Sequence, residues 1–227
     1  DLAEVIDIAY FLEATRATRP GPYTISMVEG SVTTEHEIER IKKIRDESKI
    51  LISIGTCATA GGIQALRNVA DADEYANIVY PNPEYLSYLK TASPISDYVD
   101  VDMELWGCPV DKKQLLEVIV ALLQNRRPVL LQSSVCMECK QAGTICVLVA
   151  EGTPCIGPAT RAGCGAVCPT MGRGCYGCFG PQDGANTDSL SDILTDIERY
   201  PGETERLFNN ISNFAPAFHE AASKLKD

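Results

Sequence analysis

The sequence has few basic residues, few histidines and no long hydrophobic run, and each shortage excludes a class of function. Lysine and arginine number 20 against 31 acidic residues, which gives a formal net charge of −11. Nucleic-acid binding needs a basic footprint, so we expect no nucleic-acid partner. No apolar run approaches the roughly 18 residues that cross a bilayer, so we expect no direct membrane span.

Common catalytic patterns are also missing. No phosphate-binding glycine fingerprint opens a helix, and no nucleophile-and-base pattern occurs. The two histidines, His36 and His219, fall on the first turn of a charged helix and in the last expected helix. We expect both to be solvated rather than to bind metal. Hydrolytic chemistry therefore finds no support.

What the sequence has in abundance is cysteine, concentrated in one glycine-rich segment. Eight of the ten cysteines occur within 43 residues. Eight thiols are two sets of four, the ligand count of two cubane iron–sulfur clusters. Two C-x2-C pairs each bring two thiols onto one tight turn. The eight are Cys136, Cys139, Cys146, Cys155, Cys164, Cys168, Cys175 and Cys178.

Zinc and disulfide bonds are the alternatives for these thiols. A structural zinc ribbon also uses C-x2-C pairs, but zinc takes four thiols and would leave four more unused beside it. Disulfide-dense scaffolds are usually short and lack a large core, whereas the first half of this chain looks able to fold unaided. The run from Cys164 through Cys168 to Pro169 matches the end of the bacterial ferredoxin pattern. We therefore predict iron–sulfur clusters.

The first half alternates apolar strands with amphipathic helices. Strands are expected at 5–12, 23–28, 49–55 and 99–107. Helices are expected at 34–47, where Thr34 and Glu37 form a capping-box pattern, at 61–68 and at 111–124. Segment 71–97 is expected to be mostly loop. This alternation predicts an α/β fold with a doubly wound parallel sheet.

The second half has a different organisation. It follows the hinge Arg126-Arg127-Pro128, and its cysteine-rich part is expected to be mostly loop. Two C-terminal helices are expected, one carrying Leu190 and Leu194 and one over 212–225. We predict a flavodoxin-like domain over 1–130 and an iron–sulfur domain over 131–227.

Cys57 and Cys108 stand apart from the other cysteines. Each directly follows an expected strand. Ligands of open α/β sheets bind outside the carboxyl ends of the strands, so the two thiols have the right positions to share one site. Buried, inert free thiols are equally compatible with the spacing.

Four segments of the chain resemble one known family. They are 54–62 (IGTCATAGG), 106–109 (WGCP), 154–164 (PCIGPATRAGC) and 174–181 (GCYGCFGP). They resemble the small, electron-transferring subunit of [NiFe] hydrogenases, over about residues 28–181. The resemblance is closest to the cytoplasmic multimeric branch, which includes sulfhydrogenases, NAD(P)-coupled enzymes and related archaeal types.

The resemblance implies a ligand set for each cluster. The distal [4Fe–4S] cluster takes Cys136, Cys139, Cys146 and Cys155. The medial [4Fe–4S] cluster takes Cys164, Cys168, Cys175 and Cys178. The proximal cluster, which faces the nickel–iron site, takes Cys57 and Cys108. Its other two ligands form a C-x2-C at the end of the family's first strand. No such pair precedes Cys57, so we expect it upstream of Asp1.

The resemblance also implies a function. The chain is expected to relay electrons between a nickel–iron site in a large subunit and a downstream acceptor subunit, a flavin or iron–sulfur protein. No catalytic residue of H2 chemistry is expected in this chain, and the expected location is cytoplasmic. The alternatives are a quinone-reductase-type subunit with a single cluster, or an interaction module stabilised by zinc or disulfides. The physiological acceptor is chosen by other subunits.

Overall fold

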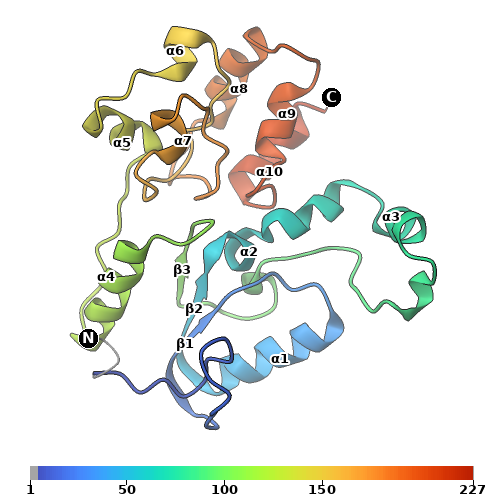
Figure 1. Cartoon of the computed structure of the whole chain (residues 1–227), viewed down its shortest axis with the longest axis vertical. Coiled ribbons are helices and arrows are strands. Elements are labelled where there is room, and N and C mark those ends of the chain that lie inside the picture. The colour runs from blue at the N-terminus through green and yellow to red at the C-terminus, as the bar shows by residue number, and fades with distance from the viewer. Residues whose placement is uncertain (1–4, 227) are drawn as a thin grey trace.

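The first lobe is built on a small parallel β-sheet, seen in the lower half of Figure 1. The structure is a computed structural model and describes residues 5–226. Among these residues the sheet has three strands in the order β1 (Tyr23–Val28), β2 (Ser48–Ile54) and β3 (Met103–Leu105). Both pairings are parallel. The carboxyl ends of all three strands therefore lie at one edge.

Helices cover both faces of this sheet. Successive side chains of a strand point to opposite faces, and the fully buried neighbours Leu51 and Ile52 show the consequence. Leu51 packs with Ile41 of α1 (Glu35–Asp46). Ile52 packs with Val118 of α4 (Lys112–Leu123). The predicted α/β class, with a parallel sheet wound on both sides, is confirmed.

Side chains fix where the two covering helices begin. At α1 the backbone N–H of Glu37 donates to Thr34 Oγ1 at 3.2 Å, and Glu37 Oε2 accepts from the Thr34 N–H at 3.0 Å. This is the capping box that the sequence predicts. At α4 the Asp111 carboxylate accepts the N–H of Gln114 at 2.9 Å. Each cap satisfies a backbone donor that has no partner inside the helix.

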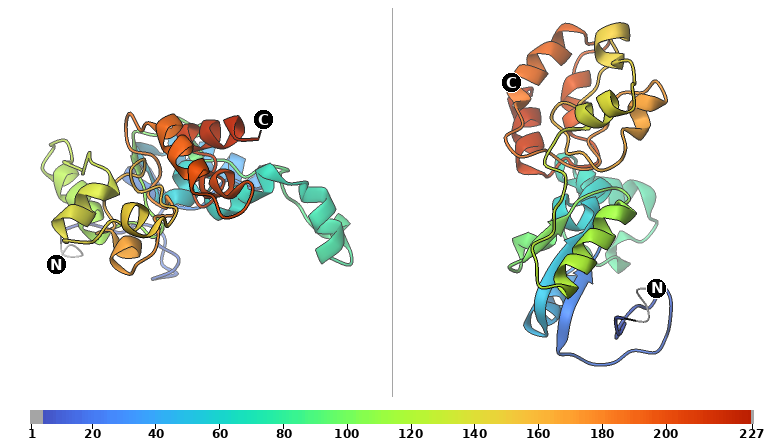
Figure 2. Two further views of the ribbon diagram at one scale, coloured as in Figure 1. Left: turned by 90° about the horizontal axis from the view of Figure 1, so that it is seen from above. Right: turned by 90° about the vertical axis from the view of Figure 1, so that its left-hand side faces the viewer.

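The connection from β2 to β3 includes an arm that projects from the first lobe in the left view of Figure 2. It contains α2 (Gly55–Ala60), α3 (Ala72–Val79) and three 3₁₀ helices, η2 (Gly62–Val69), η3 (Pro83–Tyr85) and η4 (Ile95–Asp97). The expectation of mostly loop over 71–97 is wrong for α3. Asp71 caps that helix by accepting the N–H groups of Asp73 and Glu74.

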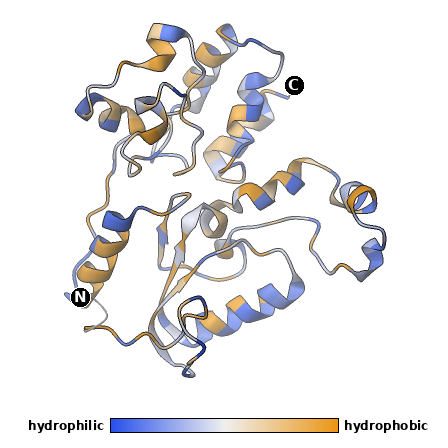
Figure 3. Cartoon of the chain, in the orientation of Figure 1, coloured by the Kyte–Doolittle hydropathy of each residue, from blue (hydrophilic) through white to orange (hydrophobic). Residues whose placement is uncertain are grey.

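The strand expected over 5–12 is also absent. These residues form turns and irregular backbone, and Val5 and Leu12 are 69% and 56% exposed. Figure 3 shows the apolar colouring of much of this N-terminal stretch. An apolar run becomes a strand only where a neighbouring strand completes its backbone hydrogen bonds. Residues 5–12 make no ladder with β1.

The second lobe combines the cysteine-rich segment with a helical layer. The segment holds three short helices, α5 (Val135–Gln141), α6 (Val147–Glu151) and α7 (Val167–Thr170). The layer consists of α8 (Thr187–Asp196), α9 (Glu203–Phe208) and α10 (Pro216–Lys224). The second expected helix therefore starts at Pro216 rather than at 212, and α9 is an additional helix. Within the described residues, no helix has the length and apolarity to cross a membrane.

The core of the second lobe joins the helical layer to the cysteine-rich loops. Leu194, Phe208 and Phe218 come from α8, α9 and α10 and are almost fully buried. They pack with Ile156, the residue that follows Cys155. The layer is thus a support for the thiol-bearing loops. The domain boundary at residue 130 stays a prediction.

Candidate metal centre

All ten cysteines are free thiols within the described residues. The first predicted set begins on α5, where Cys136 and Cys139 lie almost one turn apart. Cys146 is the N-cap residue of α6. Cys155 is buried in the loop that follows this helix. The four thiols of this set thus come from short helices and turns within 20 residues of sequence.

The electrostatics of Cys139 show which thiols are its neighbours. Burial raises the pKa of Cys139 to about 11, because burial disfavours the charged thiolate. Negative charge on adjacent thiols adds to this rise. In order of effect, those thiols are Cys136, Cys155, Cys146 and Cys164. Cys136, Cys146 and Cys155, the other members of the predicted distal set, are therefore electrostatic neighbours of Cys139, and so is Cys164 of the other set.

The second set lies around Cys178. Burial raises the pKa of Cys178 to about 11, and charges on Cys164 and Cys168 add to the rise. Burial also raises the pKa of Cys175 to about 12. Cys168 is carried by α7, and Cys164 precedes that helix in a loop. These are the four thiols of the predicted medial set.

The two sets touch each other. The backbone N–H of Cys175 donates to Cys155 Sγ at 3.2 Å, although the resemblance assigns these residues to different clusters. Cys155 also has Cys146 and Cys168, one thiol from each set, among its charged neighbours. The division of eight thiols into two ligand sets therefore stays a prediction.

The surroundings of the sulfurs fit iron–sulfur ligation. Besides the bond to Cys155, the N–H of Gly177 donates to Cys175 Sγ at 3.5 Å. Backbone donors of this kind tune cluster sulfurs. A Cβ at Gly157 would lie 3.3 Å from Cys155 Sγ, so glycine leaves space beside a sulfur. Within residues 5–226, no three His, Cys, Asp or Glu side chains are arranged to hold a single metal ion.

Cys57 and Cys108 lie at the carboxyl edge of the sheet. Cys57 is on α2 directly after β2, and Cys108 follows β3. Burial raises the pKa of Cys57, and the next largest cause is charge on Cys108. A Cβ at Gly62 would lie only 2.4 Å from Cys57 Sγ. This glycine therefore lets the chain fold closely over the thiol.

The edge of the sheet contacts the medial set directly. The buried Thr56 donates its hydroxyl to the carbonyl of Cys178 at 2.5 Å. Charge on Cys108 contributes to the raised pKa of Cys178. Trp106 covers Gly180, where a Cβ would meet the indole ring at 2.1 Å. Cys57 and Cys108 are therefore electrostatic neighbours, as are Cys108 and Cys178, and Cys164 has this relation to both Cys178 and Cys139.

Three residues of this region hold the loops together without being cysteines, and the sequence gives little sign of their roles. Thr56 links the sheet edge to the loop of Cys178. Glu138 binds the loop of Cys164, and Gln114 donates to the carbonyl of Ala162 at 3.4 Å. The only signal that could have found them is the position of Thr56 and Glu138 next to cysteines.

Comparisons with known proteins agree with this arrangement. Residues 1–122 match the family described as NADH ubiquinone oxidoreductase, 20 Kd subunit. Sulfhydrogenase 2 subunit delta of Pyrococcus furiosus is 36% identical over 87% of this chain and 82% of its own length. A vhu subunit of the F420-non-reducing hydrogenase of Methanocaldococcus jannaschii is 35% identical over 72% of this chain and 67% of its own.

A solved structure is similar as well. The crystal structure of an NAD+-reducing [NiFe]-hydrogenase in the H2-reduced state matches with a TM-score of 0.51 and 26% identity. The match covers 56% of this chain and 79% of that one. The chain belongs to the NADH ubiquinone oxidoreductase 20 Kd subunit family. Within that family it is a component of a hydrogenase, which confirms the resemblance seen in the sequence.

The match to the family and the match to the Pyrococcus hydrogenase subunit cover different lengths of this chain. The family match ends at residue 122, before the cysteine-rich segment. The Pyrococcus relative aligns over 197 residues, so its similarity reaches into that segment. The similarity to hydrogenase subunits therefore includes residues beyond the part that the family description covers.

Proposed function

We propose that this chain is the electron-transfer subunit of a [NiFe] hydrogenase. It relays electrons between the nickel–iron site of a large subunit and a downstream acceptor subunit. The observation that carries the proposal is that neighbouring thiols follow one another from Cys57 and Cys108 through Cys178 and Cys164 to Cys139, with the hydrogen bonds from Thr56 to Cys178 and from Cys175 to Cys155 joining the groups. A subunit without a relay function has no need of ligands that extend across both lobes.

The residues divide into three ligand groups in this proposal. The thiols of Cys57 and Cys108 hold part of a proximal [4Fe–4S] cluster, whose further ligands are a C-x2-C upstream. The medial and distal [4Fe–4S] clusters have the ligand sets given above. When bound, each cluster supplies one-electron redox chemistry at a potential set by burial, charge and hydrogen bonds. The chain supplies the burial and the N–H donors, and α8 to α10 support the loops from behind.

The partners follow from the two ends of the series. The end at Cys57 and Cys108 faces the large subunit in this proposal. The end at Cys136 and Cys146 faces the acceptor subunit, a flavin or iron–sulfur protein. Cys108 and Cys146, one thiol in each of these groups, are exposed, and a covering partner at each group would bury them. The proposed location is cytoplasmic.

Metal analysis of the purified hydrogenase complex tests the cofactors. The two clusters of the second lobe require about eight iron atoms and as many acid-labile sulfides from this chain. A single-cluster subunit of the quinone-reductase type requires about four in total. Zinc in place of iron would contradict the relay proposal outright.

The substitution Cys57→Ser tests the relay itself. We expect H2-linked dye reduction to be lost, while the spectra of the medial and distal centres persist. The matched control is Ala142→Ser, at an exposed position at the end of α5. A Cys57→Ser complex with full activity would show that this thiol has no part in electron transfer.

A further inference from the structure

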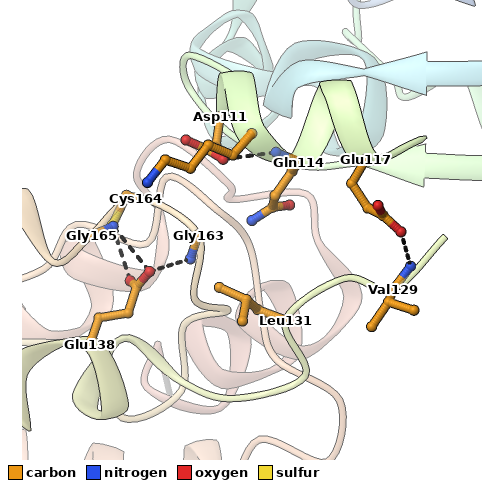
Figure 4. Close-up of a pocket in the computed structure, with 10 residues that line it drawn as sticks. Asp111, Gln114, Glu117, Val129, Leu131, Glu138, Gly163, Cys164 and Gly165 are labelled. Atoms are coloured by element: carbon orange, nitrogen blue, oxygen red, sulfur yellow. Dashed lines mark hydrogen bonds between the residues drawn. The ribbon is translucent and has the colours of Figure 1, made fainter. Parts of the chain in front are cut away.

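Glu138 connects the two predicted ligand sets. It lies on α5 between Cys136 and Cys139, but its carboxylate binds the loop of the other set, as Figure 4 shows. Oε1 accepts the N–H of Gly163 at 2.9 Å and of Gly165 at 3.0 Å. Oε2 accepts the N–H of Ala166 at 3.3 Å. One carboxylate therefore holds three donors of the loop that presents Cys164.

The shape of this loop creates an anion site. Gly165 and Ala166 both have left-handed backbone, with φ of +69° and +54°. Such conformations turn successive N–H groups toward one point and form a concave site for negative charge. Three converging donors favour an anionic acceptor. In this chain the acceptor is the side-chain carboxylate of Glu138 rather than a bound ion. The loop is therefore shaped around the carboxylate.

A second contact holds the same loop from the first lobe. The Gln114 side chain of α4 donates to the carbonyl of Ala162. Gly163 has a φ of +142°, and a Cβ there would lie 2.8 Å from the Phe179 ring as well as against Gln114 Nε2, so glycine is favoured at this position. A cavity of about 450 Å³ opens beside this contact, lined by Glu138 and Cys164 among others. The cavity leaves this side of the loop open. Glu138 is therefore the side chain that holds the loop against α5.

The carboxylate is also close to a predicted ligand sulfur. Glu138 Oε2 lies 3.8 Å from Cys164 Sγ. A negative charge at this distance disfavours the more negative, reduced state of any centre that Cys164 binds. Glu138 lies between Cys139 of one set and Cys164 of the other, so it acts where the two sets meet.

We propose that Glu138 is a positioning residue that fixes the medial ligand loop against α5 and lowers the reduction potential of the medial centre. This inference rests on the proposed function, because it requires iron–sulfur clusters in the second lobe. It assigns a role to a side chain that is itself neither a ligand nor a surface contact. The role has two parts. Fixing the loop depends on the length of the side chain, and lowering the reduction potential depends on its charge.

Two substitutions separate these properties. Glu138→Gln keeps the length and one acceptor oxygen, but it removes the charge and turns an N–H₂ donor toward the loop donors. Glu138→Asp keeps the charge but is one methylene shorter and loses the reach. Glu151→Gln is the matched control, because Glu151 is an exposed carboxylate in the same segment. Among the described residues its side chain makes no recorded hydrogen bond or ion pair.

The experiment is a redox titration of the purified complex, followed by electron paramagnetic resonance. We expect the medial centre of E138Q to titrate at a more positive potential than that of E151Q, with wild-type iron content. We expect E138D to lose iron to a chelator at least about threefold faster than E151Q, since charge-assisted hydrogen bonds to the loop are broken. Equal potentials in E138Q and E151Q, or equal rates in E138D and E151Q, overturn the role of Glu138.

These outcomes differ from a failure of the proposed function. A wild-type complex whose chain carries no iron refutes the relay, and the role of Glu138 falls with it. An iron-loaded wild type combined with an unshifted E138Q refutes only the role of Glu138. In that case the relay proposal stands.

Discussion

Phe218 of α10 connects the stability of the second lobe to its thiol-bearing loops. Its side chain is 1% exposed, and its ring lies 5.6 Å from that of Phe208 at an angle of 57°. A Cβ at Gly177, between Cys175 and Cys178, would lie 2.9 Å from the Phe218 ring. The ring therefore forms the floor under the C-x2-C turn.

The cost of Phe218→Ala follows from this burial. Core Phe→Ala substitutions cost about 3–5 kcal/mol, and the tilted pair with Phe208 accounts for roughly 1 kcal/mol of that. We expect about 4 kcal/mol, or a thousandfold change in the folded-to-unfolded ratio. Domains have only about 5–15 kcal/mol in total. The variant should therefore fold, but with a large part of its stability lost.

Urea unfolding of the full chain, followed by circular dichroism, measures this cost. Phe11→Ala is the matched control, because Phe11 is 46% exposed and should cost at most about 1 kcal/mol. With clusters bound, F218A should also release the iron of the medial set before that of the distal set. A free energy of unfolding for F218A within about 1 kcal/mol of F11A would refute the assignment of Phe218 to the core.

Three further changes have expected outcomes. Gly62→Ala places a Cβ 2.4 Å from Cys57 Sγ at a φ of +62°; it should cost at least about 1 kcal/mol, or roughly 2–4 °C in Tm, and should increase thiol labelling of Cys57. Thr34→Ala breaks the capping box and should cost about 1 kcal/mol in urea unfolding, whereas an unchanged midpoint would mean the cap is not formed. The pKa of Glu117 falls from 4.5 to about 2, chiefly because Arg126 binds it. A lowered carboxyl pKa stabilises the fold above the unfolded pKa, so the Tm deficit of Glu117→Gln should be present at neutral pH and vanish as pH falls toward about 2. A deficit that is independent of pH would contradict the ion pair.

The elements that the sequence predicts well are those with two agreeing signals. The helix of α1 has both an apolar face and a capping box, and the strand of β2 is an apolar run that both helical layers cover. The run at 5–12 has apolarity alone, and its backbone finds no partner strand among the described residues. The three prolines of segment 71–97 suggest loop, but the cap of Asp71 precedes them and starts α3. Local chemistry decides the helix starts, whereas strands depend on distant partners.

The candidate site also has a part that the sequence predicts and a part that it does not. The number and spacing of the cysteines make the candidate thiols visible in the sequence, and each C-x2-C needs only its own turn. The contacts that arrange them are long-range: Glu138 binds residues 25 to 28 positions away, and Thr56 binds the carbonyl of Cys178 at a separation of 122. Polar residues at such separations leave no periodic signal in one sequence. The candidate ligands can therefore be proposed from the chain, but the contacts that arrange them cannot.

The long-range contacts also show how the two lobes would be coupled in the relay that we propose. Thr56 and Trp106 follow β2 and β3 at the carboxyl edge of the sheet, and both contact the segment that contains Cys178 and Gly180. Parallel strands end on one edge, so the sheet necessarily presents Cys57, Cys108 and these two contacts together. The first lobe thus contacts the segment of Cys178 and Gly180 through Thr56 and Trp106, and Glu138 links α5 to the loop of Cys164. A change in either connection should alter electron transfer between neighbouring centres more than the ligation within one.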